Sequence, residues 1–493
     1  MKKLSNKINI TIEALLLKNA STDQSISPLE LFTPLANEPW AVWLDSCNSE
    51  HINSQFDILV WQPEITLSTF GELTHIEQKN SAVRVSKEEP LKLVDISANK
   101  IFSQYNLPDL SQTPDKGDDK KTSTVLPFIG GALGYFSYDL GRRFEKLPSV
   151  AQQDISIPDM AIGIYTQAII FDRKSDKCYL VCPENKRADI TQYLQDKLQD
   201  KLQESAFSKK QAVEQFKLTN AWQSNLSKHQ YGEKFKQVQD YLLSGDCYQI
   251  NLAQRFSAKY QGDEFLAYQA LRTSNNAPFS AFMRFNDAAI LSISPERFLS
   301  VKNNRVQSKP IKGTKARDNN PIIDQKNAET LQHSIKDRAE NVMIVDLLRN
   351  DISKVCLAGS VVVPELFAIE SFPAVHHLVS TVEGELAHEY SNTDLLTAAF
   401  PGGSITGAPK IRAMEIIEEL EPHRRSIYCG SIGYISACGS MDTSITIRTL
   451  VCQKNVIHCW AGGGLVADST LESEYQETYD KVKKILPVLS KLS

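Results

Sequence analysis

The sequence predicts an α+β fold built of layers of strands and helices. Strand-like runs occur in neighbouring pairs, and helical patterns separate them without the regular alternation that a parallel sheet requires. The clearest of these runs span 248–256, 288–293, 360–363, 432–436 and 443–451. A chain of 493 residues with 42% hydrophobic and 23% charged residues is typical of a globular protein with a large core.

The first of three segments, residues 1–185, mixes short strand-like runs with turn residues. The runs at 56–61 and 161–171 are apolar enough to form buried strands. Residues 107–124 are rich in Pro, Asp, Lys, Gly and Ser, a composition typical of a solvated loop. We therefore expect short strands interrupted by one long polar loop.

The second segment, residues 186–226, is highly charged. Leu194, Leu198 and Leu202 recur every four residues, which places them on one face of a helix. Three turns are too few for a coiled coil. The segment is therefore predicted to be a connecting helix that packs on the outside of the protein.

The third segment, residues 227–493, carries most of the helical patterns. Helices are predicted over 231–242, 331–347, 411–420 and 471–486. The first should end at Gly245, because glycine readily adopts the left-handed conformation that closes a helix. Arg297 to Ser308 is predicted to be a β-hairpin turning at Asn303-Asn304, since asparagine tolerates positive φ.

Charge and cysteine content exclude several classes of protein. A formal net charge of −5 argues against a nucleic acid or an anionic membrane as partner. No apolar run reaches the roughly 18 residues that a membrane span needs. The nine cysteines follow no disulfide or zinc-site spacing, so we expect reduced thiols in a soluble, cytoplasmic protein.

Two glycine-rich stretches resemble nucleotide-binding motifs but fail on spacing. In 402–410, Ala408-Pro409 separates Gly407 from Lys410, whereas a phosphate loop needs the glycine and lysine adjacent. Residues 462–467 fit Gly-x-Gly-x-x-Ala, but too little chain follows for the helix and strand of a dinucleotide fold. Neither stretch predicts a nucleotide site.

Three carboxylates form a candidate metal site. Glu474 and Glu477 are three residues apart on a predicted helix, so they share a face. Glu340 lies beside the apolar stripe of its own helix and needs a partner there, for which Mg2+ is one answer. A salt bridge with Arg338 or Arg349, or simple exposure, is the alternative.

The predicted hairpin also brings a carboxylate close to a lysine. With the turn at 303 and 304, paired positions sum to 607, so Glu296 would face Ile311, next to Lys312. A desolvated lysine beside a carboxylate can act as a nucleophile or a base, or form a plain ion pair. Geometry alone leaves all three open.

Several ordered motifs resemble the chorismate-utilising enzymes. They are Pro310-Ile311-Lys312-Gly313-Thr314, the stretches 338–351 and 403–410, Ile447-Arg448-Thr449, the glycines at 462–464, and Glu474-Tyr475-Gln476-Glu477-Thr478 with Lys481. Upstream, 130–135, 138–145 and 245–252 extend the resemblance over nearly the whole chain. It implies two orthogonally packed antiparallel β-sheets flanked by helices, with the N-terminal segment supplying strands to them.

Lys312 separates the branches of this family. Anthranilate synthases carry Ala at the matching position, whereas the branch that replaces the 4-hydroxyl of chorismate by an amine carries lysine. The resemblance therefore implies conversion of chorismate and ammonia to 4-amino-4-deoxychorismate, with Glu296 as general acid and Lys312 as nucleophile on the ring. The alternatives are anthranilate synthase component I and a catalytically silent chorismate-binding subunit.

The resemblance also implies the ligands of Mg2+ and of the substrate. Glu340 and Glu477 match the family's Mg2+ ligands, with Glu474 beside them. The residues matching substrate-binding positions are Arg448, Tyr428, Thr406, Gly462, Gly464, Lys481 and His377. A satisfied core histidine is the alternative for His377, because Leu378-Val379 follow it.

Two further expectations concern other ligands and partners. Pro39 and Ser46 lie in a segment resembling the family's tryptophan pocket, although an apolar strand with Trp40 and Trp43 in the core explains it equally well. No cysteine has the Gly-x-Cys-x-Gly setting of a glutaminase nucleophile. We therefore expect a separate glutaminase subunit to supply the ammonia.

Overall fold

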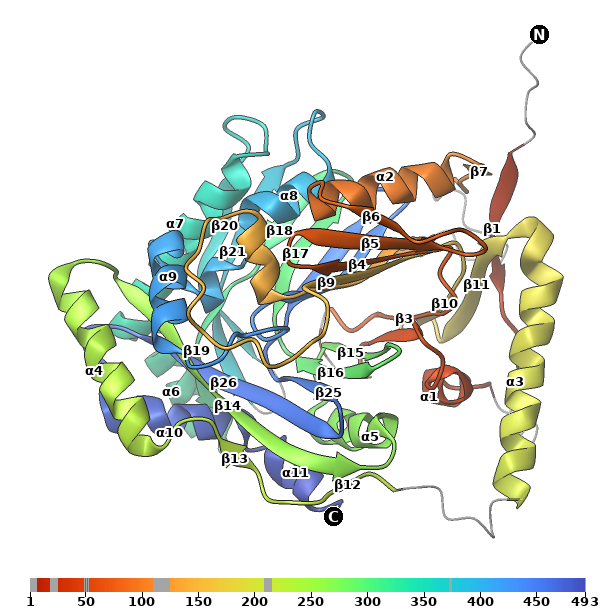
Figure 1. Ribbon diagram of the computed structural model, residues 1–493. Coiled ribbons are helices and arrows are strands. Elements are labelled where there is room, and N and C mark those ends of the chain that lie inside the picture. Colours follow the sequence, from red (N-terminus) through yellow and green to blue (C-terminus); the bar gives the residue numbers. More distant parts are fainter. Residues whose placement is uncertain are drawn as a thin grey trace.

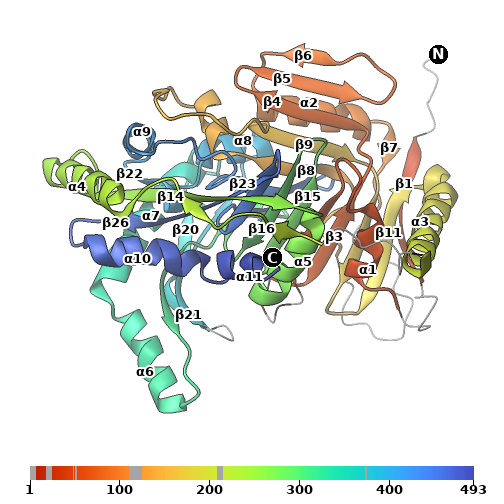
Figure 2. The same ribbon diagram turned by 60° about the horizontal axis from the view of Figure 1, so that its bottom comes forward.

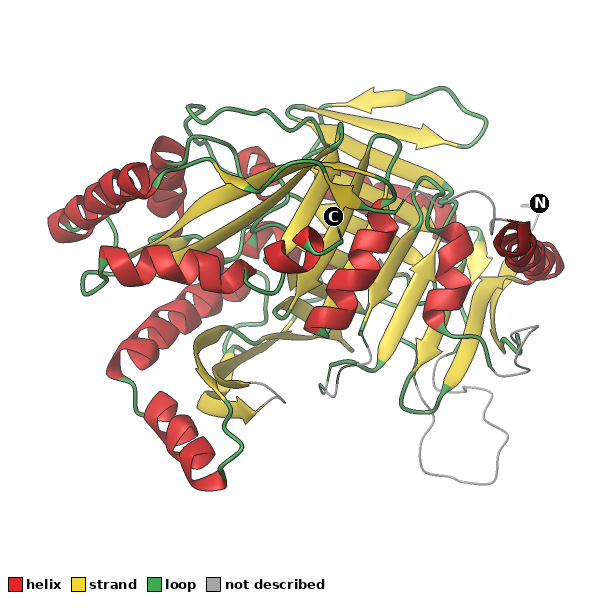
Figure 3. Cartoon of the chain, turned by 90° about the horizontal axis from the view of Figure 1, so that it is seen from below, coloured by secondary structure: helices red, strands yellow, loops and turns green. Residues whose placement is uncertain are grey.

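The computed structural model describes residues 7–17, 25–47, 49, 51, 53–109, 125–207, 215–371 and 375–492. Two large β-sheets form the centre of the molecule, and helices lie outside them (Figures 1 and 3). The predicted α+β class is confirmed.

The first sheet runs, in the part of the chain that the structure describes, through twelve hydrogen-bonded neighbours. In spatial order they are β12 (Lys217–Leu218), β14 (Gln249–Gln261), β26 (Val456–Leu465), β25 (Thr449–Gln453), β16 (Ala288–Ser294), β15 (Phe279–Arg284), β2 (Val42–Asp45), β3 (Phe56–Val60), β10 (Ala168–Asp172), β11 (Lys177–Pro183), β1 (Ile8–Ala14) and β7 (Tyr105–Asn106). Two short strands, β13 (Gln223–Ser224) and β22 (Gly407–Ala408), also pair with β14.

The second sheet is formed in the same way from both halves of the chain. In spatial order its strands are β19 (Ile311–Ala316), β21 (Val375–Glu385), β18 (Arg305–Ser308), β17 (Arg297–Lys302), β24 (Met441–Ile445), β23 (Ser431–Ser436), β8 (Gly131–Phe136), β9 (Met160–Tyr165), β4 (Ile65–Phe70), β5 (Leu73–Gln78) and β6 (Arg84–Ser86). β20 (Val362–Ser371) pairs with β21.

Strands from the N-terminal segment lie in the interior of both sheets. β2 pairs with β15, and β8 pairs with β23, in each case antiparallel. The pairing of β1 with β7 is parallel, so the first sheet departs at this end from the antiparallel arrangement that we expected. The N-terminal strands therefore complete the sheets instead of forming a separate core.

Helices cover the outer faces. α1 (Pro28–Phe32), α3 (Arg187–Phe207), α5 (Glu264–Asn275) and α11 (Leu486–Ser490) share a core with strands of the first sheet. α2 (Pro90–Phe102), α7 (Ile335–Ser353) and α8 (Asn392–Ala399) contribute to the largest core, together with strands of the second sheet. A small third core joins α4 (Lys228–Ser244) and α9 (Lys410–Leu420), and α6 (Pro321–Gln332) projects from the body (Figure 2).

Local signals in the sequence set several boundaries correctly. α4 ends at Gly245, whose φ is 81°. The hairpin of β17 and β18 turns at Asn303 and Asn304, with φ of 51° and 61°. Its pairs sum to 607 as predicted, for example Ser300 with Gln307. The buried Leu194 anchors α3 against the first sheet, as the leucine spacing predicted.

Two runs that were predicted as single strands each form two strands, and these two strands lie in different sheets. The run 161–171 divides into β9 and β10, and 443–451 divides into β24 and β25. The crossings are marked only by short polar interruptions, Thr166-Gln167 and Thr446 to Arg448, which contain no glycine or proline and are buried or half-buried as the chain passes from one sheet to the other. Hydrophobic pattern alone therefore could not mark them.

Two predicted helices are also divided. The helix over 331–347 is the end of α6 and most of α7, with Ser334 as the cap that starts α7. The helix over 471–486 is α10 (Leu471–Val482), and α11 follows it. Most of the predicted loop, residues 110–124, lies outside the described residues.

Candidate active site

The candidate site lies where the chain crosses between the two sheets. Glu296 occupies the crossing from β16 to β17, and Arg448 the crossing from β24 to β25. The two crossings are tied by the backbone: the Ile445 N–H donates to the Glu296 carbonyl at 3.0 Å, and the Ile293 N–H donates to the Arg448 carbonyl at 3.0 Å. An acid and a cation are thus fixed side by side by the main chain.

Lys312 reaches Glu296 by a different route from the one predicted. β19 does not continue the hairpin ladder but pairs with β21, so the predicted pairing of Glu296 with Ile311 across one ladder is wrong. The β19–β21 register shifts between Ile311 and Thr314, and Gly313 in this bulge has φ of 81°. Because a bulge re-aims side chains, it turns Lys312 inward toward the acid.

Ser404 joins the acid and the lysine. The Lys312 Nζ donates to the Ser404 carbonyl at 2.9 Å, and the Ser404 hydroxyl donates to Glu296 Oε1 at 3.3 Å. Burial raises the pKa of Glu296, although Lys312 and Ser404 oppose it. Burial lowers the pKa of Lys312, although Glu296 and Glu340 oppose it. Both shifts favour a neutral acid beside a neutral amine.

The three predicted carboxylates lie on two helices near this pair. Glu340 is on α7, and Glu474 and Glu477 are on α10. Glu340 pairs neither with Arg338 nor with Arg349; the Lys336 Nζ lies 4.0 Å from its Oε1 and 3.8 Å from Glu474 Oε1. Neither alternative salt bridge therefore forms.

Charges around these carboxylates shift their pKa values in different directions. Burial raises the pKa of Glu340 and of Glu474, and the neighbouring Glu477 adds to the rise at Glu474. At Glu477 burial is outweighed by lysines, chiefly Lys481 at 2.7 Å, so its pKa is lowered. Glu340 and Glu474 therefore lack enough nearby positive charge to offset their burial, whereas Glu477 is paired with Lys481.

These residues fit a hard divalent cation. Glu474 Oε2 is buried and has no hydrogen-bond partner in the structure. A Cβ on Gly463 would lie 3.1 Å from that oxygen and 3.2 Å from Glu477 Oε1, so glycine leaves room beside both carboxylates. Across the described ranges, no three His, Cys, Asp or Glu side chains are gathered closely enough to hold a metal as they stand. Carboxylate oxygens are nevertheless the ligands that Mg2+ prefers, and one of them, Glu474 Oε2, has no hydrogen-bond partner.

Arg448 and Lys481 are electrostatic neighbours of the acid, and His377 lies near Arg448. Arg448 has φ of 52° and makes no ion pair with any residue that the structure describes, although Glu296 is its electrostatic neighbour. Burial and the Arg448 charge lower the pKa of His377 to about 4, and its Nδ1 lies 2.8 Å from the Thr314 hydroxyl. The Lys481 Nζ donates to the Gly462 carbonyl at 2.7 Å.

The remaining predicted substrate residues are held inside the protein. The Tyr428 ring stacks on Trp460 with centroids 6.1 Å apart. The buried Thr406 hydroxyl donates to the carbonyl of Gly402 at 3.2 Å, within the loop that carries Ser404. Thr406 therefore belongs to the loop that carries Ser404, and Tyr428 belongs to the packing around Trp460.

Gly462 and Gly464 have a packing reason to be glycine. Both lie in β26 and pair with β14. A Cβ on Gly464 would come 2.0 Å from the Gln249 side chain, and one on Gly462 would come 2.7 Å from the Leu252 carbonyl. Close strand packing is thus one reason for glycine, strongest at Gly462, where the contact is with backbone; the substrate-binding role of both glycines stays a prediction.

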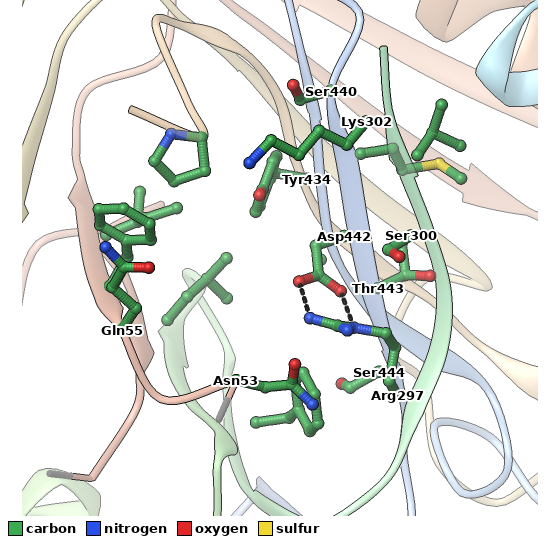
Figure 4. Close-up of a pocket in the computed structure, with 18 of the residues that line it drawn as sticks. Asn53, Gln55, Arg297, Ser300, Lys302, Tyr434, Ser440, Asp442, Thr443 and Ser444 are labelled. Atoms are coloured by element: carbon green, nitrogen blue, oxygen red, sulfur yellow. Dashed lines mark hydrogen bonds and ion pairs between the residues drawn. The ribbon is translucent and has the colours of Figure 1, made fainter. Parts of the chain in front are cut away.

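A separate cavity of about 720 Å³ opens between the two sheets (Figure 4). Ser46, Asn53 and Gln55 line it from the N-terminal segment, and Arg297 and Tyr434 from the second sheet. Pro39 is not among its lining residues and is exposed. Of the two residues predicted for a tryptophan pocket, the structure brings only Ser46 to a cavity.

Sequence reasoning missed Ser404 and Lys336 as parts of the site. Ser404 lay within the motif at 403–410, but its contact with Lys312 runs through its backbone carbonyl, for which side-chain identity gives no signal. Lys336 is one helical turn before Glu340, and this i, i+4 spacing could have revealed it.

Comparison with known proteins agrees with this geometry. Residues 41–487 match the family described as chorismate binding enzyme. The chain is 52% identical over 461 residues to aminodeoxychorismate synthase component 1 of Escherichia coli (strain K12), covering 93% of this chain and 95% of the relative. The crystal structure of anthranilate synthase component I from Streptococcus pneumoniae TIGR4 superposes with a TM-score of 0.72 at 31% identity, covering 89% of this chain and 93% of that one.

The chain therefore belongs to the chorismate-binding enzymes. Anthranilate synthase component 1 of Thermus thermophilus is more distant, at 38% identity over 363 residues, which are 73% of this chain and 77% of that one. At 50 to 52% identity, the relatives within the family are aminodeoxychorismate synthase component 1 proteins. The predicted resemblance is confirmed.

Proposed function

We propose that this enzyme converts chorismate and ammonia to 4-amino-4-deoxychorismate, the role that its relatives' name describes. The observation that carries the proposal is the contact of Lys312 and Glu296 through Ser404, with burial favouring the neutral form of both. A neutral amine can attack a ring carbon, and a neutral carboxylic acid can protonate a departing hydroxyl.

The reaction then takes two displacements. The Lys312 Nζ lone pair forms a bond to C2 of the ring, both ring double bonds shift along C1, C6 and C5, and the C4–O bond breaks. Glu296 gives its proton to the leaving hydroxyl, which departs as water. Ammonia next bonds to C4, both double bonds return, and the C2–Nζ bond breaks to release the neutral Lys312 amine. The new C4 ammonium then gives a proton to Glu296 and restores it. The balance is chorismate plus ammonia giving 4-amino-4-deoxychorismate plus water.

The carboxylates and Arg448 would hold the substrate's two negative charges. Glu340, Glu474 and Glu477 would hold Mg2+, which would supply the positive charge that attracts a substrate carboxylate the glutamates alone would repel. Arg448, which lacks a carboxylate partner in the described residues, offers two parallel N–H donors to the other substrate carboxylate. Lys481, His377, Tyr428 and Thr406 complete the walls.

A separate glutaminase subunit would supply the ammonia, and the product would serve p-aminobenzoate and folate synthesis. None of the nine cysteines makes a disulfide, and burial raises the pKa of Cys429 to about 12, which suits a structural thiol and not a nucleophile. Reduced thiols suit the cytoplasm. No described helix has the length and apolarity to cross a membrane.

The inter-sheet cavity would bind tryptophan. Its walls offer apolar side chains for an indole ring and polar ones for the amino acid head group, such as Asn53 and Tyr434. Ser46, whose hydroxyl donates to Asp57 at 3.0 Å, would act at its edge.

Product identification tests the proposal. The purified chain is incubated with chorismate, Mg2+ and an ammonium salt, and the products are separated and identified by mass spectrometry. We expect 4-amino-4-deoxychorismate, and no turnover with glutamine until a glutaminase subunit is added. Formation of anthranilate or isochorismate in its place would contradict the proposal.

A further inference from the structure

Ser404 touches the acid and the nucleophile with different atoms. Its backbone carbonyl accepts a hydrogen bond from the Lys312 Nζ at 2.9 Å, and its hydroxyl donates to Glu296 Oε1 at 3.3 Å. We propose that Ser404 is a positioning residue that aims the Lys312 lone pair with its carbonyl and adjusts the proton on Glu296 with its hydroxyl. This inference rests on the proposed function, in which both groups react.

The loop that carries Ser404 is fixed from several sides. The Arg425 guanidinium donates to the Ile405 carbonyl at 3.0 Å, and the Asn251 N–H donates to the Thr406 carbonyl at 2.8 Å. A Cβ on Gly403 would lie 2.2 Å from the Leu347 side chain, so this turn is pressed against α7. Ser404 thus offers its two atoms from a rigid support, as precise positioning requires.

A carbonyl is a suitable partner for a lysine that must lose its proton. An uncharged acceptor directs one N–H without the full stabilisation of the ammonium that a carboxylate would give. Because one N–H of the neutral Lys312 amine is held by the Ser404 carbonyl, its lone pair points away from that carbonyl. The charges facing Lys312 are Glu296, Glu340 and Glu477, which favour the ammonium, and Lys481, which opposes it.

The hydroxyl acts on the other partner. A donor to the Glu296 carboxylate stabilises the charged form, and so opposes the effect of burial on its pKa. The other groups facing Glu296 are the cations Lys312, Lys481 and Arg448 and the Ile311 N–H. After Glu296 has given up its proton, the Ser404 hydroxyl stabilises the carboxylate that remains.

Ser404→Ala separates the two contacts, because alanine keeps the carbonyl and removes the hydroxyl. The measurement is the pH profile of kcat/KM for chorismate, with free ammonia held constant by adjusting the total ammonium salt. We expect the limb that belongs to Glu296 to move to higher pH by roughly one pH unit, while the Lys312 limb stays. Ser404→Thr, which keeps a hydroxyl, should return the limb to the wild-type position.

The control is Ser431→Ala. It removes another buried hydroxyl, that of Ser431 in β23, which donates to the Ser444 carbonyl at 2.8 Å. It should leave both limbs in place. A Ser404→Ala profile that superposes on wild type, or only falls in height, would overturn the inference. If Ser404→Ala does not fold, Ser404→Cys, whose thiol is a weak donor, takes its place with the same expectation. Failure of wild type to make 4-amino-4-deoxychorismate in this assay would instead overturn the proposed function.

Discussion

The inter-sheet cavity and the candidate active site both contain charged side chains, but they differ in how those charges are paired. On the wall of the cavity, Arg297 makes two hydrogen bonds to Asp442, at 2.9 and 2.8 Å (Figure 4). Arg305, also on this wall, pairs with Glu383. In the active site, Glu474 keeps an orphaned oxygen, and Arg448 has no ion pair among the residues described.

This difference indicates what each region is built to receive. Charges that neutralise each other fix a wall and leave a cavity for a ligand with little net charge. Charges without partners are costly to bury unless a ligand completes them. We therefore predict that the active site receives a dianion and a cation together, and four predictions test this contrast.

Lys312→Ala should have the largest effect. Removing the nucleophile should lower kcat by about a thousandfold or more, while the thermal unfolding temperature changes little. Lys315→Ala, an exposed lysine on the same strand, is the matched control and should retain activity. Wild-type turnover by Lys312→Ala would mean that the lysine is only an ion-pair partner.

Arg448→Lys should have the second-largest effect. An ammonium cannot reproduce two parallel donors, so the KM for chorismate should rise roughly 10- to 100-fold with a smaller change in kcat. Arg305→Lys, which changes a paired arginine at the cavity, should leave this KM unchanged. Equal effects of the two variants on KM would remove the distinction between the regions.

Glu474→Gln should weaken Mg2+ binding about tenfold, measured by calorimetry without substrate. An amide has no net charge to attract the cation. Glu472→Gln removes an exposed carboxylate from the same helix, one that pairs with Lys228, and should bind Mg2+ like wild type. Unaltered Mg2+ affinity in Glu474→Gln would show that the orphaned oxygen is not a ligand.

The smallest effect concerns stability at the cavity. Burial, together with the nearby Asp45, raises the pKa of Asp57 to about 7, although Arg173 opposes it. Because the folded state then binds more protons than the unfolded state between about pH 4 and 7, stability should fall as pH rises through this window. Asp57→Asn should flatten that slope in urea unfolding, because asparagine does not titrate; the loss of the Arg173 ion pair should lower stability mainly at the higher pH values, where Asp57 is ionised. Asp346→Asn, an exposed change, should keep the wild-type slope, and an unchanged slope in Asp57→Asn would contradict the assignment.

Local features of the fold could be predicted because their causes are local. Asn303-Asn304 and Gly245 adopt the positive φ that their residue types favour, and the hairpin register follows from its turn. That the chain passes from one sheet to the other at Glu296 and Arg448 could not be predicted, because the sheet that a strand joins depends on its distant pairing partners and not on its own apolar pattern. The juxtaposition of Glu296 with Lys312 was predicted correctly, but through a ladder that does not form; a bulge produces it instead.

The site residues were predictable to different degrees for the same reason. Motif resemblance pointed to Lys312 and Arg448 by residue type, and the structure places both beside Glu296. Ser404 contacts Lys312 through its backbone carbonyl, which every residue possesses, so sequence alone gives no sign of that contact. Its two hydrogen bonds become visible only in the folded structure, where the loop places it between Lys312 and Glu296.

The covalent role of Lys312 is the central claim, and trapping tests it most directly. The purified enzyme is incubated with chorismate and Mg2+ in the absence of ammonia, quenched rapidly, digested and mapped by mass spectrometry. We expect the peptide that contains Lys312 to carry the mass of chorismate less one water, and the addition of ammonia before the quench to remove it. An unmodified Lys312 peptide in an enzyme that makes 4-amino-4-deoxychorismate would show that ammonia attacks the ring directly, and the nucleophile assignment would be wrong.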